Sequence, residues 1–340
     1  AMKRAYYQIL VAALLLPLWA ACTGPAEAPA GSEGEAAAET ATPANNEIEL
    51  PYGFKMTVFA EELGRGRHLT VRDNGDVYLA LRSLEEGHGI VALRDEDGDG
   101  RADRIERFGD YPGTGIEVHG DYLYFGSDST VYRYPLREGE LVPDLEPEVI
   151  VEGFPEQRQH AVKPFAFDQE GHIYVNVGGP SNACQEEMRT PGSPGLDPCP
   201  QLERHAGIWR FDADQPGQTQ VEDGHRYATG IRNSVALAWN DSDNHLYVVQ
   251  HGRDQLDQLF PEHFNAEQNA QLPAEEFLRV SDGSDFGWPY CYYDQIQGKK
   301  VLAPEYGGDG EVVGRCDQFE DPILAFPGHW APNDLIFYTG

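Results

Sequence analysis

Short runs of alternating hydrophobic and polar residues repeat along the chain in a fixed order. A polar residue opens each run, an apolar strand follows, the chain turns at Asp, Asn or Gly, and a second strand is centred on Tyr. Four copies begin at His68, Gly115, His160 and Arg232, and a weaker fifth begins at His329. Each copy predicts a β-hairpin, because two runs with a period of two flank turn residues.

The central tyrosines of the four clear copies set the period of the repeat. They are Tyr78, Tyr124, Tyr174 and Tyr247, which stand 46, 50 and 73 residues apart. The first two intervals match the roughly 40–50 residues of a propeller blade, and an enlarged blade explains the third. We therefore predict an all-β protein, a six-bladed-type β-propeller. About four and a half blades are visible, so we expect the sequence to be incomplete at its C-terminal end, because a propeller closes on itself to remove its edges.

The repeat also predicts where each blade begins and ends. The blades cover residues 49–108, 115–153, 160–230 and about 232–322, the last enlarged by insertions over 261–273 and 288–316. The fifth copy predicts a strand over 335–338. The best helix signal, PAEEFLRV from Pro273, is weak.

Equivalent strand starts in successive blades converge on the axis of a propeller, so the opening residues are candidates for a site. They are Arg67 and His68 in the first blade, His160 in the third, Arg232 with Asn233 in the fourth, and His329 in the fifth. An imidazole can act as a base near neutral pH, and a guanidinium suits carboxylates or an anionic oxygen. A hydrogen-bonded structural histidine and a structural salt bridge are the alternatives.

Two segments carry cation-binding patterns. The turn after the strand that ends at Gln250 offers the carbonyls of Gly252 and Arg253 and a carboxylate at Asp257, which suits a hard cation such as Ca²⁺. DEDGDGRADRIE places Asp95, Asp97, Asp99, Asp103 and Glu106 at the ligand positions of an EF-hand loop. A strand precedes this loop, so a structural Ca²⁺ loop between strands and a solvated acidic turn both remain open.

The net charge restricts the partners. The formal charge is −32 at pH 7, with a pI near 4.5. Such a field repels nucleic-acid phosphates and anionic lipid surfaces, and we expect no nucleic-acid partner.

The N-terminal region reads as a targeting segment. Lys3 and Arg4 precede an apolar run that ends at Cys22, which predicts a signal peptide over 1–22. Its end resembles the lipobox of bacterial lipoproteins, so we expect an exported protein, anchored through lipid at the outer membrane or in the periplasm, with plain secretion as the alternative. Residues 23–47 predict a disordered acidic linker, and 48–340 the propeller domain.

The remaining cysteines suit an oxidising compartment. Sequence alone leaves their pairing open, but we expect the two local pairs, Cys184–Cys199 and Cys291–Cys316, each of which closes a Pro/Gly-rich loop. No C-x-x-C-H motif occurs, which excludes a c-type haem attachment.

Several segments, taken together and in this order, resemble the soluble-type, pyrroloquinoline-quinone-dependent glucose/sorbosone dehydrogenase family. They are 160–175, 229–239, 251–257, 286–291 and 329–340, and the last two look most like the sorbosone branch. The resemblance implies a six-bladed propeller with the quinone across the axial mouth. It implies that His160 is the catalytic base and that Arg232 and Asn233 contact the cofactor. It further implies that Arg67 and His68 reach the pocket, that the carbonyls of Gly252 and Arg253 hold the cofactor's Ca²⁺, and that Asp257 belongs to an adjoining calcium site.

Two positions depart from the family pattern. Gln159 precedes the base at the position of an Asp in the better-known enzymes of the family, and the turn reads Gly-Arg rather than Gly-Pro. We expect an enzyme that oxidises an aldose, a sorbosone-like sugar or a polyol and passes electrons to an external acceptor such as a cytochrome or a membrane quinone. The alternatives are a non-catalytic surface lipoprotein that binds a glycan or a protein, and a Ca²⁺-dependent lactonase-type propeller.

Overall fold

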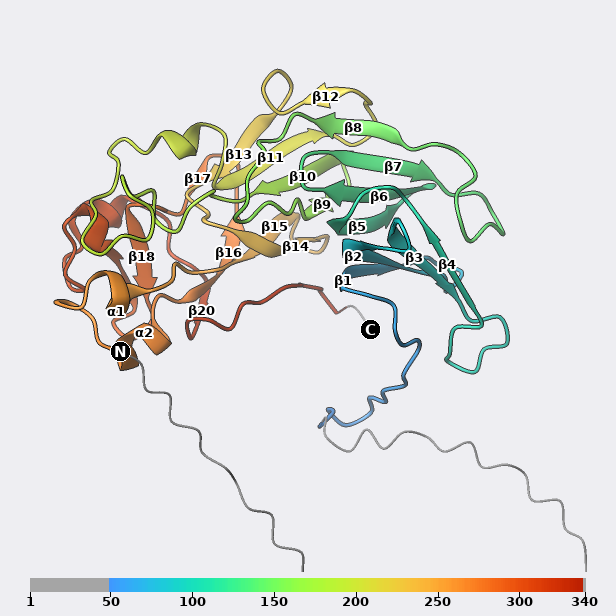
Figure 1. Cartoon of the computed structure of the whole chain (residues 1–340), viewed down its shortest axis with the longest axis horizontal. Coiled ribbons are helices and arrows are strands. Elements are labelled where there is room, and N and C mark those ends of the chain that lie inside the picture. Colours follow the sequence, from blue (N-terminus) through green and yellow to red (C-terminus); the bar gives the residue numbers. More distant parts are fainter. Residues whose placement is uncertain (1–48, 339–340) are drawn as a thin grey trace, which may run out of the picture. The chain divides into compact units, whose positions relative to one another are not determined.

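The computed structural model describes residues 49–338. The predicted signal peptide, Cys22 and the linker over 23–47 therefore lie outside the described residues. Within the described part of the chain, residues 56–338 belong to one compact unit, and every described helix and strand lies in it (Figure 1). No helix in the described part of the chain is long and hydrophobic enough to span a bilayer.

Four sheets follow one another along the chain and correspond to the four predicted blades. The first contains β1 (Gly66–Val71), β2 (Val77–Glu85), β3 (His88–Arg94) and β4 (Arg104–Phe108). The second contains β5 (Gly113–His119), β6 (Tyr122–Ser127), β7 (Val131–Pro135), β8 (Glu148–Glu152) and β12 (Gln218–Thr219). The third contains β9 (Phe165–Phe167), β10 (His172–Val177), β11 (Gly207–Asp212), β13 (His225–Thr229) and β17 (Ser284–Asp285). The fourth contains β14 (Ser234–Asn240), β15 (His245–Gln250), β16 (Glu275–Val280) and β20 (Leu324–Phe326).

The other α-helices and strands lie between the strands of the fourth blade. They are α1 (Leu256–Leu259), α2 (Ala266–Gln271) and the hairpin of β18 (Cys291–Asp294) and β19 (Lys299–Leu302). The described residues also include 3-10 helices at Pro200–Glu203, Pro304–Tyr306 and Gly314–Gln318. The weak helix signal from Pro273 was wrong, because those residues form β16. This strand is hydrogen-bonded to β15 on one side and β20 on the other, and such pairing overrides a weak helical preference.

Each predicted hairpin of the four clear copies is present, as β1–β2, β5–β6, β9–β10 and β14–β15. The strand predicted over 335–338 is not, since the described residues after β20 pair with no other strand. The fold is thus all-β and propeller-like with four blades in the described residues, and the six-bladed ring stays a prediction.

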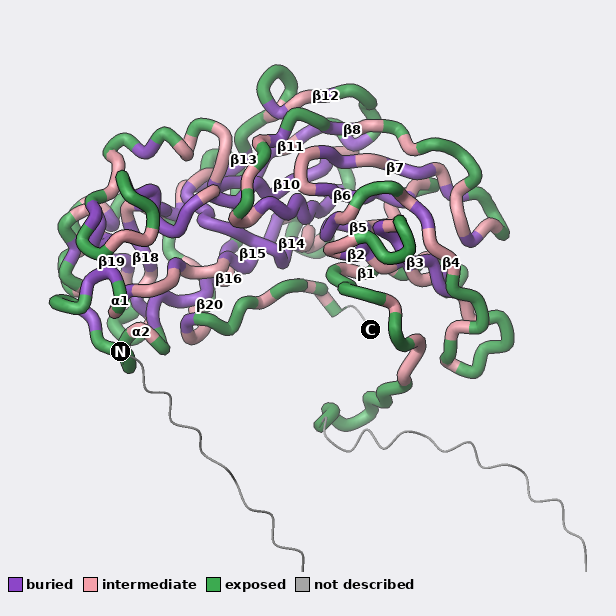
Figure 2. The backbone as a smooth tube through the Cα atoms, viewed as in Figure 1, coloured by how far each residue is buried: buried purple, intermediate pink, exposed green. Residues whose placement is uncertain are grey.

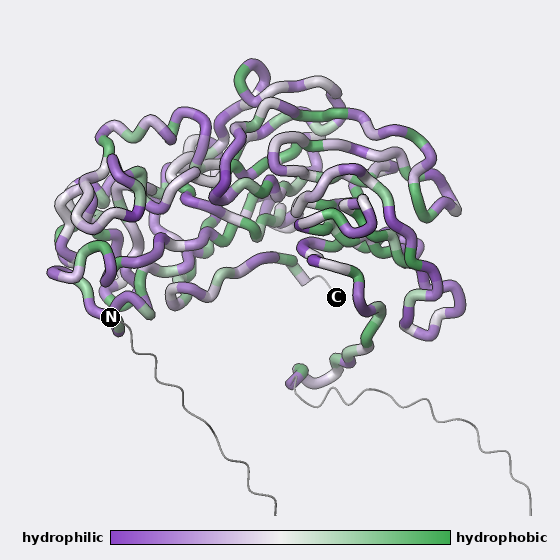
Figure 3. Tube along the Cα trace, viewed as in Figure 1, coloured by the Kyte–Doolittle hydropathy of each residue, from purple (hydrophilic) through white to green (hydrophobic). Residues whose placement is uncertain are grey.

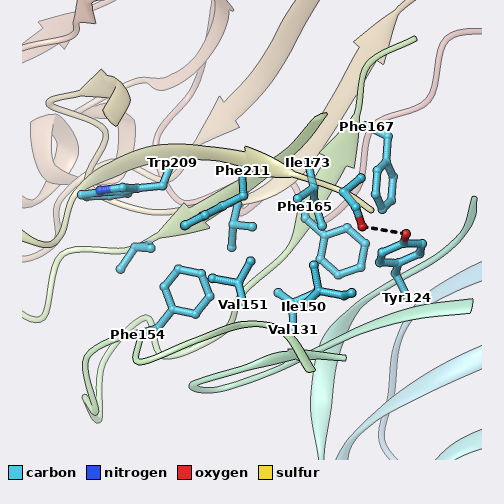
Figure 4. Close-up of a cluster of buried hydrophobic side chains, with 13 residues drawn as sticks. Tyr124, Val131, Ile150, Val151, Phe154, Phe165, Phe167, Ile173, Trp209 and Phe211 are labelled. Atoms are coloured by element: carbon cyan, nitrogen blue, oxygen red, sulfur yellow. Dashed lines mark hydrogen bonds between the residues drawn. The ribbon is translucent and has the colours of Figure 1, made fainter. Parts of the chain in front are cut away.

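Apolar side chains fill the spaces between consecutive sheets. Between the second and third sheets, Tyr124, Val131 and Ile150 pack against Ile173 and Trp209 (Figure 4). Similar clusters lie between the first and second sheets and between the third and fourth. The central strands are accordingly buried while the outer loops are exposed (Figure 2), and hydropathy follows the same division (Figure 3).

The repeated tyrosines have polar as well as apolar contacts. The hydroxyl of Tyr78 donates to the carbonyl of Leu141 at 3.0 Å, and that of Tyr124 donates to the carbonyl of Ala213 at 2.9 Å. These two hydrogen bonds tie one blade to the next. Stacking the blades in this way fixes where the start of each innermost strand lies.

Candidate active site

His160 stands immediately before the third blade in a left-handed conformation, with φ of 53°. Its Nδ1 lies 2.5 Å from the carbonyl oxygen of Gly179. A carbonyl only accepts, so Nδ1 carries the proton and the neutral ring keeps an accepting lone pair at Nε2. Burial, followed by the positive charge of Arg232, lowers the pKa of His160 to about 3. The imidazole is therefore neutral, with the tautomer of a base that acts through Nε2.

Gly178 makes room for His160 and Asn233 to approach each other. A Cβ at this position would lie 2.5 Å from the Cβ of His160 and 2.6 Å from the Oδ1 of Asn233. Such distances are far below van der Waals contact, so only glycine fits. The Oδ1 of Asn233 is buried and has no hydrogen-bond partner among the described residues.

Arg232 begins the fourth blade and is 3% exposed. Its Nη1 donates to the carbonyls of Gly252 at 2.6 Å and His251 at 3.4 Å. Its Nη2 donates to the carboxylate of Asp254 at 3.1 Å, and Asn182 accepts from the remaining edge. Burial lowers the pKa of Arg232 to about 10, which still leaves it positively charged at neutral pH.

Asp254, in the turn after β15, forms ion pairs with two arginines. Its Oδ2 accepts from Arg232 and from Arg189, each at 3.1 Å. Burial alone would raise the pKa of Asp254, but the neighbouring arginines prevail and hold it below its ordinary value. Asp254 therefore carries a full negative charge that balances part of the positive charge here.

The predicted cation turn lies directly against this arginine. The carbonyl of Gly252 accepts from Arg232, as described above, while the side chain of Arg253 points away and forms a buried ion pair with Glu305. Asp257 falls in α1, and its Oδ1 is buried without a partner in the described part of the structure.

The first-blade and fifth-copy residues reach the same region by different routes. His68 Nε2 lies 2.6 Å from the carbonyl of Asn333, next to Pro332, whose carbonyl lies 2.7 Å from His251 Nε2. Arg67 is exposed and contacts the Asn333 side chain at 3.5 Å. The fifth-copy opening residue, His329, is 4.0 Å from Asp254.

An axial cavity adjoins His68. It has a volume of about 890 Å³ and is lined by residues of β1, β5, β9, β14 and the segment 334–338. Burial, with the charge of Asp334, raises the pKa of Glu117 in its wall to about 8. The innermost strands thus surround a common cavity, as the repeat predicts. Of the predicted site residues, only His68 lines this cavity, whereas Arg232, Gly252 and Arg253 line a separate, much smaller pocket.

The second cation pattern lies elsewhere. Asp95, Asp97 and Asp99 offer carboxylate oxygens within 4.8 Å of one another between β3 and β4. Asp103 and Glu106 are not part of that group, since Asp103 accepts from the backbone of Glu96 at 2.7 Å and Glu106 pairs with Arg104. The structure assembles three of the five predicted ligands.

The two predicted disulfides, Cys184–Cys199 and Cys291–Cys316, are both present. They close loops that pack beside the site, where the indole Nε1 of Trp288 donates to the carbonyl of Asn182 at 3.1 Å. Sequence reasoning missed three residues that shape the site, namely Gly178, Gly179 and Asn182. The paired glycines directly after a buried strand were the available signal for a close backbone approach.

Known structures share this fold at low sequence identity. The holo form of the pyranose dehydrogenase PQQ domain from Coprinopsis cinerea is 18% identical, with 86% of this chain and 72% of that chain covered and a TM-score of 0.68. The calcium structure of the Trichoderma reesei Carbohydrate-Active Enzymes Family AA12 protein is 18% identical, with 82% and 71% covered and a TM-score of 0.65. A putative oxidoreductase (glucose dehydrogenase) from Thermus thermophilus is 19% identical, with 82% and 75% covered and a TM-score of 0.51.

No curated protein matches the sequence. The family model described as TrAA12-like matches residues 48–340, which include all four blades and every predicted axial residue. This chain belongs to the TrAA12-like family.

Proposed function

We propose that this chain is an exported oxidoreductase that uses pyrroloquinoline quinone and Ca²⁺ to oxidise an aldose, a sorbosone-like sugar or a polyol. The observation that carries the proposal is the neutral imidazole of His160, with its free Nε2, beside the buried charge of Arg232. The shared fold adds support, because one similar structure is described as a holo PQQ domain and another as a calcium structure.

The positively charged residues around His251 suit the binding of a quinone that bears carboxylates. Arg67 lies near Arg65 and Arg82, and both Arg67 and Arg232 lie near His251. This concentration of positive charge contrasts with a chain whose net charge is −32. The unpartnered Oδ1 of Asn233 offers an acceptor to a bound group. Arg67, His68, Arg232 and Asn233 would hold the quinone.

The turn after β15 fits Ca²⁺ through its oxygen atoms. Gly252 and Arg253 would supply carbonyls, and the carbonyl of Gly252 has a second lone pair besides the one that faces Arg232. The buried, unpartnered Oδ1 of Asp257 suits an adjoining cation. When bound, the quinone with its Ca²⁺ would supply the acceptor for hydride.

The protein's own part in the reaction is to move a proton. The Nε2 of His160 would take the proton of the substrate hydroxyl while Gly179 keeps Nδ1 protonated. Burial and then the charge of Arg232 disfavour the imidazolium that results, so an anionic ligand beside Arg232 would remove the second of these effects and raise the pKa of His160.

Reconstitution tests the proposal. The protein is mixed with pyrroloquinoline quinone and Ca²⁺ and desalted, its absorbance is recorded, and dye reduction is followed across a panel of aldoses, sorbosone and polyols. We expect quinone absorbance that stays with the protein and dye reduction with at least one sugar. Loss of the quinone on desalting would contradict the proposal. A preference for sorbosone over glucose would support the sorbosone branch.

The electron acceptor and the location of the protein are further parts of the proposal. Electrons would pass to an external acceptor such as a cytochrome or a membrane quinone. A lipid on Cys22 would provide the only attachment to a membrane. Radiolabelled palmitate on the full chain, abolished by Cys22→Ala, is the expected result if the lipobox is used.

A non-catalytic surface lipoprotein that binds a glycan or a protein is the second candidate. It is favoured by the hydrogen bonding of Arg232, whose guanidinium already has protein acceptors and already binds the carbonyl of Gly252. In that case the reconstituted protein would retain no quinone and would still bind immobilised glycans.

A further inference from the structure

A fully buried asparagine joins the elements of the candidate site. Asn182 is 0% exposed and follows the two glycines after β10, shortly before the loop that Cys184 and Cys199 close. Neither the repeat nor any motif marks it in the sequence. Its side chain and backbone nevertheless contact the residues on which the charge of the site depends.

Asn182 accepts hydrogen bonds from one edge of the Arg232 guanidinium. Its backbone oxygen accepts from Nε and its side-chain Oδ1 accepts from Nη2, each at 3.1 Å. When a guanidinium donates two parallel hydrogen bonds to one residue, these bonds fix its plane as well as its position. The other edge of Arg232 meets the carbonyls of His251 and Gly252.

The same side chain holds the backbone of Asp254. Its Nδ2 donates to the carbonyl of Asp254 and its Oδ1 accepts from the Asp254 N–H, both at 2.9 Å. The amide thus pairs with both backbone groups of one residue, as a neighbouring strand would. This pairing places the Asp254 carboxylate where Arg232 and Arg189 reach it.

We infer that Asn182 is the positioning residue that holds Arg232 and Asp254 beside His160. The inference rests on the proposed function, because it gives Asn182 a role in that site. The Nδ1 of His160 lies 2.5 Å from the carbonyl oxygen of Gly179, and the Gly179 N–H donates to the backbone carbonyl of Arg232 at 2.6 Å. The charges of Arg232 and Asp254 both act on the pKa of His160. A change in their positions therefore changes the charge that the base experiences.

Two substitutions at this position separate its contacts. Asn182→Ala removes the Oδ1 acceptor from Arg232 and both side-chain bonds to Asp254. Asn182→Asp keeps an acceptor for Arg232 but presents an oxygen to the Asp254 carbonyl, where the amide now donates. The alanine variant should free both partners, and the aspartate variant should disturb chiefly the turn that carries Asp254.

Asn176 provides a matched control. It is also an asparagine with 0% exposure and lies in β10 of the same blade, but neither polar atom of its side chain has a partner in the described part of the chain. Asn176→Ala removes a buried amide of the same size without removing a hydrogen bond between described residues.

The experiment has two readouts. In the ligand-free protein, phenylglyoxal modification of Arg232 is followed by mass spectrometry. In the loaded protein, quinone affinity is measured by absorbance titration, and kcat and KM for a sugar are measured separately. We expect Asn182→Ala to make Arg232 reactive and to lower quinone affinity about tenfold or more, the loss typical of a hydrogen bond to a charged group. Asn182→Asp should keep Arg232 protected but lower kcat, and Asn176→Ala should match the wild type in each readout.

Failure of this inference differs from failure of the proposed function. If the wild type retains no quinone, the proposed function fails, and modification of Arg232 still tests its attachment to Asn182. If Asn182→Ala leaves Arg232 protected, or if the loaded Ala and Asp variants keep wild-type quinone affinity, kcat and KM, the positioning role is wrong. A loss of thermal stability alone, with these readouts unchanged, would also overturn it.

Discussion

The acidic loop after β3 and the cluster around Arg232 both gather charged side chains, but they are held in opposite ways. Asp95 accepts from the backbone N–H groups of Gly98 at 2.7 Å and Gly100 at 2.8 Å, all within one turn of chain. Arg232 is buried, and its partners come from separate segments of the third and fourth blades. A local loop needs only its own residues, whereas the buried cluster exists only when the blades are assembled.

This contrast bears on reactivity. The loop carboxylates face water, which can solvate or release a cation at little cost. Arg232 is buried, so its charge acts strongly on its neighbours, and it contributes to the lowered pKa of His160. We therefore expect substitutions in the cluster to alter chemistry and those in the loop to alter local structure alone.

The largest effect should follow from His160→Ala. Removal of the proposed base should lower turnover by about 10²–10⁴-fold, the usual contribution of general-base catalysis, while quinone binding persists. Steady-state dye reduction and quinone absorbance on desalted protein measure the two properties. His205→Ala is the matched control. His205 lies in the third blade, and its Nδ1, like that of His160, lies within hydrogen-bond distance of a backbone carbonyl, that of Gln201 at 3.2 Å. Sugar oxidation at the wild-type rate in His160→Ala would refute the base assignment.

The next effect should follow from Arg232→Met. Loss of the buried charge leaves the carbonyl of Gly252 without its donor and Asp254 with Arg189 as its remaining arginine partner, so we expect about 3 kcal/mol of lost unfolding free energy and loss of quinone binding. Urea denaturation and absorbance titration check this. Arg133→Met removes another buried arginine, which lies in β7 of the second blade and pairs with Glu148 of β8 and with Asp214 after β11. This variant should destabilise the protein yet leave quinone binding intact. Equal quinone affinity in the two variants would contradict a specific role of Arg232 in quinone binding.

The sequence predicts what depends on neighbouring residues. Strand alternation around Tyr78 and Tyr124 is local, and so are the Pro/Gly-rich loops that the disulfides close, so the hairpins and both pairings were predicted correctly. His160 and Arg232 were found from their position in the repeat and from the family resemblance. The helix signal from Pro273 failed because β15 and β20 bind that segment from both sides.

Contacts between residues far apart in the sequence could not be predicted from local patterns. Asn182 binds Arg232 across 50 residues of sequence and Asp254 across 72. No periodicity or motif connects such positions, and an asparagine after Gly-Gly-Pro-Ser reads as ordinary loop. The acidic motif is split for a different reason, since Glu106 belongs to β4, which pairs with β3, and its side chain pairs with Arg104 instead of joining the loop.

A smaller effect should appear in the pH dependence of stability. The pKa of His160 is lowered to about 3 from an ordinary value of 6.5. Between these values the unfolded chain binds a proton that the folded protein does not, so stability is complete above pH 6.5 and falls as the pH falls. The melting temperature of the wild type should therefore drop more between pH 7 and pH 4.5 than that of His160→Asn.

Glu275 provides a control of opposite sign. Burial raises its pKa from 4.5 to about 7, so the folded protein binds the extra proton and stability falls as the pH rises through this range. Glu275→Gln should gain relative to the wild type as the pH increases toward 7 and above. Identical pH profiles for the wild type and His160→Asn would mean that the imidazole is more solvated than its surroundings indicate.

The smallest effect should follow from Asp95→Ala in the acidic loop. Water can replace its carboxylate at the exposed N–H groups of Gly98 and Gly100, so quinone affinity and turnover should stay within about twofold of the wild type. If the loop binds Ca²⁺, calorimetry should show one class of Ca²⁺ sites lost in this variant without any loss of dye reduction. Asp99→Ala, in the same loop, should behave alike. A fall in turnover comparable to that of His160→Ala would show that the loop and the cluster are coupled, and the distinction between local and assembled charge would fail.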